Sequence, residues 1–481
     1  MHYYNPESKT NKMSDSIKTT PDFNSMIRIT FWNGLGFIFF MFLKSYVVIY
    51  FFGGSGVTLG IIMALQPFAR LISMPLIGYL TDHTSKKRLI LIGSMGRTLS
   101  YILFWVSLVI HNLFLFGLGN FCQGFIVGFF WPPFYALISE KSYKGNRTQS
   151  LATGRGKMIG YGFLMGAFIS IPIFALVNIF NPDNISLMYS PLLIFAAINL
   201  IAGHRFYTKV DENLTYEKCQ ISLYDSALDM NKIEERREKV ENKKNVNNNE
   251  GISPPNEMEI IEKIEDNIQK PDKVFYFGFS ILILVILITS ITGTMYSPFI
   301  TAYLIENLLP EFSERIVPVI VMIVYFPAQV ISQLMAPTLG KIFDRISAPL
   351  SIILIGIFKT LMIWLLIWAF TPIDFAFILI FLYIATESNL YLIQAIMSRV
   401  SIKHRGKIFG LNIWVDRLGR VIGPLIGGFL WDSLGYDFPF VISIYIGLCL
   451  IPIFILAIRT LTPYMEEKVG IDKMGFMKIK K

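Results

Sequence analysis

Six charged side chains lie inside long apolar stretches of this 481-residue sequence, where chemistry is the usual reason for a charge. A charge at the centre of a membrane-embedded helix costs roughly 2.5–3.5 kcal/mol on insertion scales, so such residues face a partner or a water-filled cavity. A carboxylate in that setting can exchange a proton when desolvation and a nearby cation have balancing effects on its pKa. The six residues are Lys44, Arg70, Arg97, Lys359, Glu387 and Asp416.

Glu387 is the candidate for proton exchange, with Lys44 as the cation that could balance it. Lys44 shares a helix face with Asn33, because a separation of eleven residues makes three helical turns. Glu387 shares its face with Gln394, seven residues further along the chain. Two more apolar stretches carry polar residues at similar helical spacing.

These polar stripes suit a solute site near the midplane of a bilayer. The alternative is a buried polar network that only fixes how the helices pack. The candidate cavity residues are Asn33, Lys44, Asn120, Gln123, Trp131, Thr289, Thr292, Tyr296, Glu387 and Gln394.

Catalytic and metal-binding patterns are missing from the sequence. There is no phosphate-binding Gly-rich loop and no paired-histidine metalloprotease motif, so we expect no enzyme activity, no cofactor and no metal. The three cysteines, Cys122, Cys219 and Cys449, are too far apart in sequence to suggest a disulfide framework or a metal site. A membrane enzyme is the alternative, but it would need convergent catalytic residues, and the histidines at 83, 111, 204 and 404 lie at the ends of apolar stretches.

The elements that must hold these residues follow from composition. Hydrophobic residues make up 53% of the chain, charged residues 16%, and the mean hydropathy is +0.52. A bilayer span takes roughly 20 apolar residues. We therefore predict an all-α polytopic membrane protein with spans at 27–51, 57–80, 88–110, 113–138, 157–180, 187–204, 274–297, 315–341, 349–371, 373–397, 408–431 and 438–460.

Polar segments divide the twelve spans into two sets of six. Residues 205–273 are rich in Glu, Lys and Asn, and such a composition predicts a largely disordered linker. The expected domains are an N-terminal tail (1–26), a first bundle (27–204), the linker, a second bundle (274–460) and a basic tail (461–481). Pro298 to Leu309 prolong the seventh span or cap it at the membrane surface.

Lys and Arg are distributed unevenly between the loops, and this asymmetry predicts the orientation. One set of loops holds basic clusters around residues 86–88, 141–147, 341–345 and 399–407, whereas the opposite set holds only Arg315 among several acids. Both termini and the linker belong to the basic set. We therefore expect them to be cytoplasmic, in a multi-pass protein of the plasma membrane. The net charge of +9 is explained by topology and needs no nucleic acid.

The two halves repeat one pattern. Pro75, Gly78, Leu80 and Asp82 after the second span recur after the eighth as Pro337, Gly340, Ile342 and Asp344, each 262 residues later. The same offset relates Arg97 to Lys359, and one residue more relates Gly156, Lys157 and Gly160 to Gly419, Arg420 and Gly423. Six spans repeated as six in parallel is an architecture of secondary transporters.

The segment GYLTDHTSKKR, from Gly78 to Arg88, resembles the signature G-x-L-x-D-R-x-G-[RK]-[RK] of the major facilitator superfamily. His83 and Ser85 depart from it, standing where Arg and Gly are usual. Gly423-Pro424-x-x-Gly427-Gly428 is similar to the family's G-P-x-x-G-G element. The resemblance implies two pseudo-symmetric six-helix bundles around a central cavity, which spans one, four, seven and ten line.

The resemblance also implies a cytoplasmic gate, in which the motif acids pair with basic residues across the bundle interface. Asp82 would contact Arg417 or Arg420, and its symmetry mate Asp344 would contact Arg155 or Lys157. A solvated surface charge is the alternative for either acid. The assigned gate residues are Gly78, Asp82, Lys86, Lys87, Gly340, Asp344, Arg345, Arg155, Lys157, Arg417 and Arg420.

The buried cations Arg97 and Lys359 and the glycines of span eleven also have expected roles. We expect Arg97 and Lys359 to be structural partners of the acids and polar groups at helix ends. Glycines every four residues in span eleven, at 419, 423 and 427, make one small face that either packs statically or forms a smooth moving seam.

These patterns together predict a secondary active transporter of a small solute. It would work by alternating access, with a proton or cation as the coupling ion, in a lipid bilayer, and as a monomer. A sensor or receptor that uses the same fold and signals through residues 205–273 is the main alternative.

Overall fold

The computed structural model describes residues 19–36, 44–142, 147–216, 273–312, 316–343, 346–400, 405–464, 470–471 and 477–478. Side chains are described within these ranges except at 147–158, 336–337, 339–343, 391, 394–395, 398–400, 405–409 and from 464 onward. The predicted site residues Asp344, Arg345, Gly340, Arg155, Lys157 and Gln394 therefore lie outside the described residues or side chains.

The first helical group begins at Phe23 and ends at Lys209. Two of its predicted spans are broken. Span four breaks where Pro132 and Pro133 open a new helix, because proline cannot donate the backbone hydrogen bond that would continue the previous one. The elements are α1 (Phe23–Phe31), η3 (Trp32–Gly34), η4 (Val47–Phe51), α3 (Gly56–His83), α4 (Lys86–Val109), α5 (Leu113–Phe125), η5 (Val127–Phe129), α6 (Trp131–Glu140), α7 (Arg147–Phe180), α8 (Ile185–Met188) and α9 (Pro191–Lys209).

The second helical group begins at Lys273. Helix α12 continues through a short 3-10 turn into α13, so the apolar stretch after span seven prolongs that span as predicted. The elements are α12 (Lys273–Tyr296), η7 (Ser297–Phe299), α13 (Ile300–Leu308), α14 (Val317–Phe343), α15 (Ala348–Ile367), α16 (Pro372–Val400), α17 (Arg405–Leu434), α18 (Phe438–Leu461) and η8 (Thr462–Tyr464). A two-residue antiparallel pair, β1 (Gly470–Ile471) and β2 (Met477–Lys478), follows.

Nine helical segments in the described part of the chain are long and apolar enough to cross a membrane. They match predicted spans two to five, seven to ten and twelve, so the all-helical membrane fold is confirmed. The remaining predicted spans correspond to α1 with η3 and η4, to α9 and to α17. Helix α17 carries Asp416, Arg417 and Arg420 within its length, which lowers its hydropathy. The count of twelve stays a prediction for these three.

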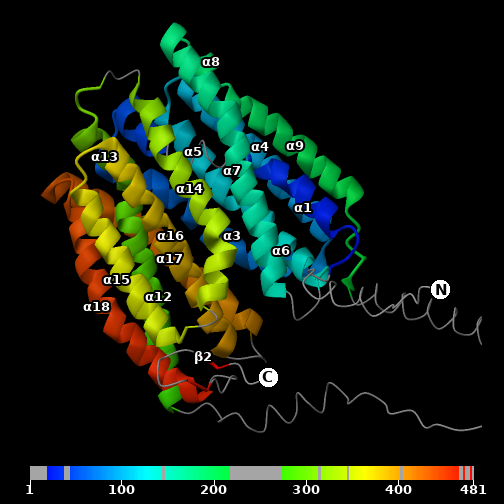
Figure 1. Ribbon diagram of the computed structural model, residues 1–481. Helices are drawn as coiled ribbons and strands as arrows, with labels where there is room; N and C mark the ends of the chain where they lie inside the picture. Colours follow the sequence, from blue (N-terminus) through cyan, green and yellow to red (C-terminus); the bar gives the residue numbers. More distant parts are fainter. Residues whose placement is uncertain are drawn as a thin grey trace, which may run out of the picture.

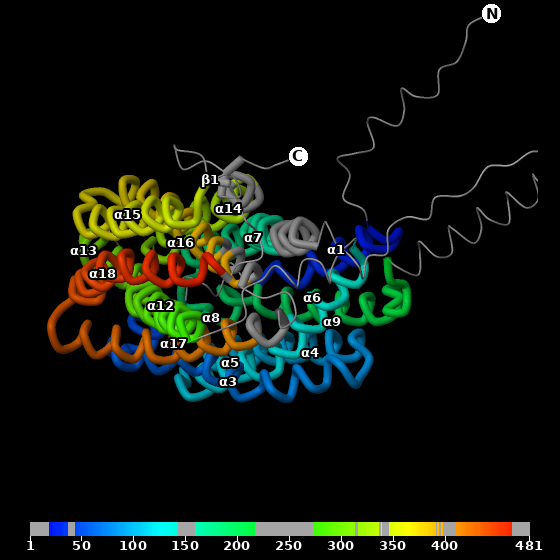
Figure 2. Tube along the Cα trace, turned by 90° about the horizontal axis from the view of Figure 1, so that it is seen from below, coloured from blue at the N-terminus to red at the C-terminus, as the bar shows by residue number. Residues whose placement is uncertain are grey.

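The two helical groups lie side by side, and the beginning of α1 and the end of α18 are at the same end of the molecule (Figure 1). We call this end the termini side and the other the opposite side. Viewed from the termini side, α12, α15, α16 and α18 lie in one bundle and α1, α4, α6 and α9 in the other (Figure 2). Helix α3 packs along α17, and α7 along α14, so these two pairs form the interface between the bundles.

The α3–α17 contact is closest at the opposite side, where glycines remove side chains from both helices. A Cβ added at Gly60 would stand 2.3 Å from the carbonyl oxygen of Pro424. One added at Gly428 would stand 2.4 Å from the carbonyl oxygen of Gly56. Small residues let helices approach closely in lipid, and here they do so across the bundle interface.

Polar contacts also join the bundles at the opposite side. The Asp432 carboxylate at the end of α17 accepts hydrogen bonds from the backbone N–H groups of Gly56 and Val57, both at 2.8 Å. The Tyr50 hydroxyl donates to Glu306 at 2.8 Å. Ser45 Oγ donates to the carbonyl oxygen of Pro298 at 2.6 Å.

The described residues at the termini side are more open. Gly78 on α3 and Gly410 on α17 have no atom within 4 Å of the position that a Cβ would take. Asp82 is exposed at the end of α3. The hydrogen bonds described between the bundles lie at the opposite side, whereas Gly78 and Gly410 at the termini side have no neighbour within reach of an added Cβ.

The glycines of span eleven face a different helix from the one that a moving seam requires. Added Cβ atoms at Gly419, Gly423 and Gly427 would meet Ser290, Ile291, Thr294 and Met295 of α12, which belongs to the same bundle. Static packing therefore describes these three glycines, and only Gly428, one residue further on, faces the other bundle.

Lys141 ties together the chain ends of the first bundle at the termini side. Its ammonium is fully buried and donates to the Asp22 carboxylate at 2.7 Å. It also donates to the carbonyl oxygens of Asp211 (2.6 Å) and Leu214 (3.0 Å). Helix α9 extends to Lys209, so the first residues of the expected linker belong to the bundle.

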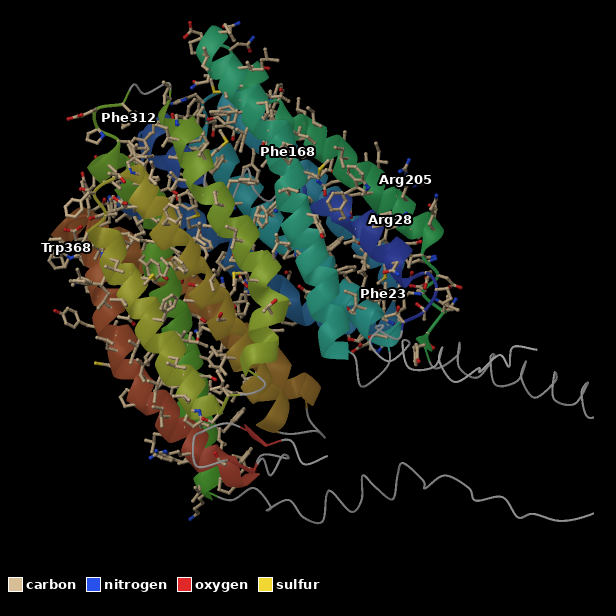
Figure 3. The ribbon with its side chains drawn as sticks, in the orientation of Figure 1. Phe23, Arg28, Phe168, Arg205, Phe312 and Trp368 are labelled. Carbon is tan, nitrogen blue, oxygen red and sulfur yellow. The ribbon has the colours of Figure 1, made fainter. Side chains whose placement is uncertain are left out.

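Large apolar side chains cover the outside of both bundles, as lipid-facing surfaces require. Phe168 on α7 points outward midway along its helix, and it is 67% exposed (Figure 3). Phe312 and Trp368 lie at the opposite side, whereas Phe23, Arg28 and Arg205 lie toward the termini side (Figure 3).

Candidate functional site

The loop between α3 and α4 carries the repeated sequence motif, and it is fastened to its own bundle. Lys86 forms an ion pair with Glu140 at 3.0 Å. Glu212 accepts hydrogen bonds from Ser85 Oγ at 3.0 Å and from the backbone N–H of Lys87 at 3.2 Å. Ser85 also caps α4 by accepting the backbone N–H of Arg88. The basic residues of the motif therefore stabilise the loop here and do not cross the interface.

The predicted gate partners are apart in this conformation. Asp82 is exposed, and within the described part of the chain it forms no ion pair. Arg420 Nε instead donates to Asp416 at 2.8 Å, one turn away on α17. Ser290 of α12 donates to the other oxygen of Asp416 at 2.8 Å. This arrangement is the one expected when the termini side is open, and the gate itself stays a prediction.

Lys44 lies inside the first bundle, where its exposed fraction is 8%. Its ammonium donates to Gln66 Oε1 of α3 at 3.0 Å and stands 5.8 Å from the ring centre of Phe104. Lys44 and Glu387 lie in different bundles, and no ion pair joins them among the described residues. The proposed balance between this cation and this carboxylate is therefore not visible here.

Arg97 is completely buried, and a guanidinium N–H donates to the carbonyl oxygen of Asn33 at 2.7 Å. Its guanidinium also lies 5.0 Å from the ring centre of Phe130. The carbonyl of Asn33 is free because span one leaves the α-helical pattern there, so Arg97 stabilises this break. The Asn33 side chain is also fully buried, and its amide finds no partner among the described residues.

Arg70 lies midway along α3, the helix that packs along α17 of the other bundle. Its Nε is shielded from solvent and has no hydrogen-bond partner in the described structure. The guanidinium is close enough to the charges of Lys44, Arg97 and Arg420 to be repelled by each of them. Arg420 belongs to α17, so the repulsion reaches across the interface.

The polar stripe of span four is divided by the proline break. Asn120 and Gln123 lie on α5, and each has one amide oxygen without a partner among the described residues. Asn120 Nδ2 donates to the carbonyl oxygen of Phe116. Trp131 lies beyond the break on α6, where its ring packs on Phe130 and Tyr135.

The polar stripe of span seven faces a cavity of about 60 Å³ inside the second bundle. Thr289, Thr292 and Tyr296 of α12 line it, together with Lys359 of α15. The cavity thus lies among α12, α15, α16 and α18. A role of this stripe in the central cavity between the bundles stays a prediction.

Lys359 is the charged member of this cavity. Gly293 is its neighbour on α12, since a Cβ added there would lie 3.9 Å from Lys359 Nζ. Its charge is also close enough to that of Arg420 for the two to repel each other. Lys359 thus borders the polar face of α12, and it forms no ion pair among the described residues. Its expected pairing with a helix-end acid stays a prediction, because Asp344 lies outside the described residues.

Glu387 lies on α16, half-buried, with one carboxylate oxygen shielded and without a hydrogen-bond partner among the described residues. Tyr383, one turn earlier on α16, is close enough to interact electrostatically with the Glu387 carboxylate.

Several residues of the site escaped sequence reasoning because they are uncharged or lie outside the repeated motifs. They are Gln66 and Ser290, which bind charged residues, and Asn389 and Ser443, which line the cavity of Lys359. Glu212 was missed because it belongs to a segment assigned to the linker. A search for uncharged hydrogen-bonding residues one or two turns from a buried charge could have found Ser290.

The sequence profile of the Major Facilitator Superfamily matches residues 26–386 and 282–479, which is nearly the whole chain. The chain belongs to the Major Facilitator Superfamily. No curated protein sequence matches it.

Solved structures agree with this family fold. A peptide transporter of the POT type in complex with sulfate aligns with a TM-score of 0.62 at 11% identity, over 95% of this chain and 99% of the other. The nucleoside transporter NupG aligns with a TM-score of 0.60 at 13% identity, over 92% and 100%. A bacterial homologue of the human lysosomal transporter Spinster, inward-facing and occupied, aligns with a TM-score of 0.61 at 12% identity, over 93% and 100%.

Family membership and fold identify this member of the Major Facilitator Superfamily as a multi-pass membrane transporter. At these identities the neighbours define the fold alone. The search of the described residues for three or more His, Cys, Asp or Glu side chains that could hold a metal finds none.

Proposed function

We propose that this protein is a secondary active transporter that moves a small solute by alternating access and couples the movement to protons. The observation that carries the proposal is the uneven contact between the bundles. Asp432, Tyr50 and Ser45 join them at the opposite side, while Gly78 and Gly410 of the same helix pair have open space beside them at the termini side. If the bundles instead joined at the termini side and parted at the opposite side, the space between them would open to the other side of the membrane.

Both termini and residues 205–273 are cytoplasmic in this proposal, and the membrane is the plasma membrane. The basic residues 86–88 and Lys141 lie at the termini side, where α9 ends at Lys209 and α12 begins at Lys273, which supports this orientation. The described conformation would then be inward-facing. A monomer suffices, because one chain supplies both bundles.

Glu387 supports the proton-coupling part of the proposal. It is a half-buried acid on a cavity-lining helix of the family, and its shielded oxygen has no partner among the described residues. An isolated acid at membrane depth is energetically costly, so its presence there indicates a function. Protonation and release by this carboxylate would link the two conformations to the proton gradient.

A reversible cross-link at the opposite side tests alternating access directly. Cysteines would replace Tyr50 and Glu306, whose side chains meet across the interface, in a protein whose native cysteines are changed to serine. The purified variant would be reconstituted into proteoliposomes and assayed for counterflow of labelled amino acids, dipeptides, nucleosides, sugars and organic acids. Treatment with a short bifunctional thiol reagent that reduction can cleave should stop exchange, and reduction should restore it.

The single-cysteine variants Tyr50→Cys and Glu306→Cys are the matched controls and should keep their activity after the same treatment. Exchange that continues unchanged in the cross-linked double variant would refute alternating access across this interface. Orientation is tested separately by an impermeant thiol reagent on intact cells. A cysteine at Asn112 should be labelled, and labelling of Cys219 would reverse the assignment.

A further inference from the structure

The interior of the first bundle has positive charges and no negative ones. Between residues 27 and 209 the only acids are Asp82, Glu140 and Asp183. Asp82 and Asp183 are exposed at helix ends, and Glu140 pairs with Lys86 at the termini side. Because this is a property of the whole sequence, no undescribed residue of the bundle can supply a carboxylate to its buried cations.

Lys141 at the termini side pairs with the Asp22 carboxylate, but Lys44 and Arg70, further inside the first bundle, have no ion pair among the described residues. Lys44 donates to an amide oxygen of Gln66, and Arg97 donates to the carbonyl oxygen of Asn33. Arg70 has no side-chain hydrogen bond or ion pair within the described part of the structure. Among the described residues, Lys44 and Arg70 therefore have no counter-ion from their own bundle.

The array continues into the second bundle. Arg420 of α17 is near enough to Arg70 and to Lys359 for its charge to repel both. Among the described residues, Asp416 is the single carboxylate bound to this group, and it is already shared between Arg420 and Ser290, with the Arg417 charge also close to it. Lys44, Arg70, Arg420 and Lys359 thus form a cationic array across the bundle interface with one carboxylate among them.

Like charges at membrane depth are costly both from desolvation and from mutual repulsion. The cost falls when an anion lies between them, because each cation then gains a charge-assisted hydrogen bond. The Arg420 side chain is 39% exposed, so a solute arriving from the termini side can reach it.

We infer that the solute is a small anion with carboxylate or phosphate oxygens, bound between Arg70 of the first bundle and Arg420 of the second. This inference rests on the proposed transport function and names its substrate class. Contact with both bundles at once is what would let such an anion draw them together at the termini side. Lys44 and Lys359 flank the site and raise the local positive potential. A cationic solute would be repelled, and a neutral one would leave the array uncompensated.

Thermal unfolding of purified protein in a neutral detergent tests the charge of the ligand, because a ligand that binds the folded state raises its apparent stability. The probes are phosphate, sulfate, succinate, citrate, gluconate and glycerol phosphate, compared with choline, putrescine and glucose at equal ionic strength. At least one anion should raise the melting temperature, whereas choline, putrescine and glucose should not. Anionic lipid is titrated in parallel, since its headgroup shares the same chemistry.

Arg70→Gln and Arg420→Gln should each weaken the binding of that anion at least about tenfold, as expected for loss of a charge-assisted hydrogen bond. Arg205→Gln is the matched control, because Arg205 is an exposed arginine of the same bundle that lies away from the interface (Figure 3). Arg70→Lys retains the charge and should bind measurably even if Arg70→Gln does not fold.

Three results would overturn the inference. They are stabilisation by choline, putrescine or glucose alone, an unchanged anion response in both Arg70→Gln and Arg420→Gln, and stabilisation by anionic lipid alone. Counterflow in proteoliposomes separates this outcome from failure of the transport proposal. Exchange of a neutral or cationic solute would sustain transport and refute the anion, whereas an anion that binds without being exchanged would sustain the site and refute transport.

Discussion

Asp432→Ala should shift the transporter away from the conformation described here. The two carboxylate oxygens of Asp432 accept the N–H groups of Gly56 and Val57, the first two residues of α3. The second bundle thus caps a helix of the first one. Removal of the carboxylate takes away an N-terminal cap and a negative charge from the positive end of the helix dipole, without removing any buried apolar surface.

The expected size follows from these two contributions. Loss of a helix cap costs roughly 1 kcal/mol. Loss of a charge at a helix N-terminus costs about 0.3–1 kcal/mol when the site is exposed, and Asp432 is exposed. The sum of about 1–2 kcal/mol changes a population ratio by roughly 5–30-fold. A conformation open at the opposite side that is populated at about 1% would rise to roughly 5–25%.

Distances between spin labels measure this shift. Phe114 at the start of α5 and Phe370 after α15 lie at the opposite side in different bundles, and they are 79% and 84% exposed. Double electron–electron resonance should show a longer distance that grows in Asp432→Ala. Asp374→Ala is the matched control, because the Asp374 carboxylate bonds only within its own bundle, to Thr371. An unchanged distance distribution in Asp432→Ala, or an equal change in Asp374→Ala, would refute the reasoning.

Three further predictions concern coupling, the gate and stability. Glu387→Gln should abolish uptake driven by a pH gradient and preserve counterflow, and wild-type gradient-driven uptake would remove Glu387 from the coupling mechanism. Asp82→Asn should lower turnover more than substrate affinity; normal transport by Asp82→Asn would favour a solvated surface charge. Lys141→Met should lower the melting temperature, because three hydrogen bonds to a buried ammonium are lost at a cost of roughly 1.5–3 kcal/mol each at most. Lys86→Met, which removes a partly exposed ion pair worth about 0–1 kcal/mol, should lower it much less, and equal effects would contradict the role of Lys141.

The helices could be predicted from the sequence because the membrane leaves the backbone few choices. Every buried N–H and C=O must bond within the segment, so an apolar run of about 20 residues becomes a helix. The break in span four could also be inferred, since Pro132 and Pro133 cannot continue a helix. The broken span one, at Trp32–Gly34 and Val47–Phe51, has no such sequence signal.

Helical periodicity predicted which residues share a face but not which neighbour that face meets. Gly419, Gly423 and Gly427 do share a face, and it packs on α12 of the same bundle. Thr289, Thr292 and Tyr296 likewise share a face, and it meets a cavity within the second bundle. Which helix lies next to a given face depends on how all the helices pack together, so it cannot be read from the sequence of one helix.

The buried charges were visible in the sequence, but their partners were not. Lys44 binds an uncharged amide 22 residues away, and Arg97 binds a backbone carbonyl, which carries no sequence signature at all. The assignment of Lys359 to a helix-end acid was reasonable for an isolated buried cation. Its closeness to Arg420 depends on how α15 and α17 approach α12, which no pairwise spacing records.

The hydrogen bonds of Lys141 determine how many residues connect the two bundles. The chain is held to the first bundle as far as Leu214, and α12 begins at Lys273. Residues 217–272 alone could bridge at most roughly 190 Å at 3.3–3.6 Å per residue, several times the thickness of a bilayer. The number of residues in the connection therefore places no limit on how far the two bundles can move relative to each other. What the covalent connection supplies is a high effective concentration of each bundle near the other.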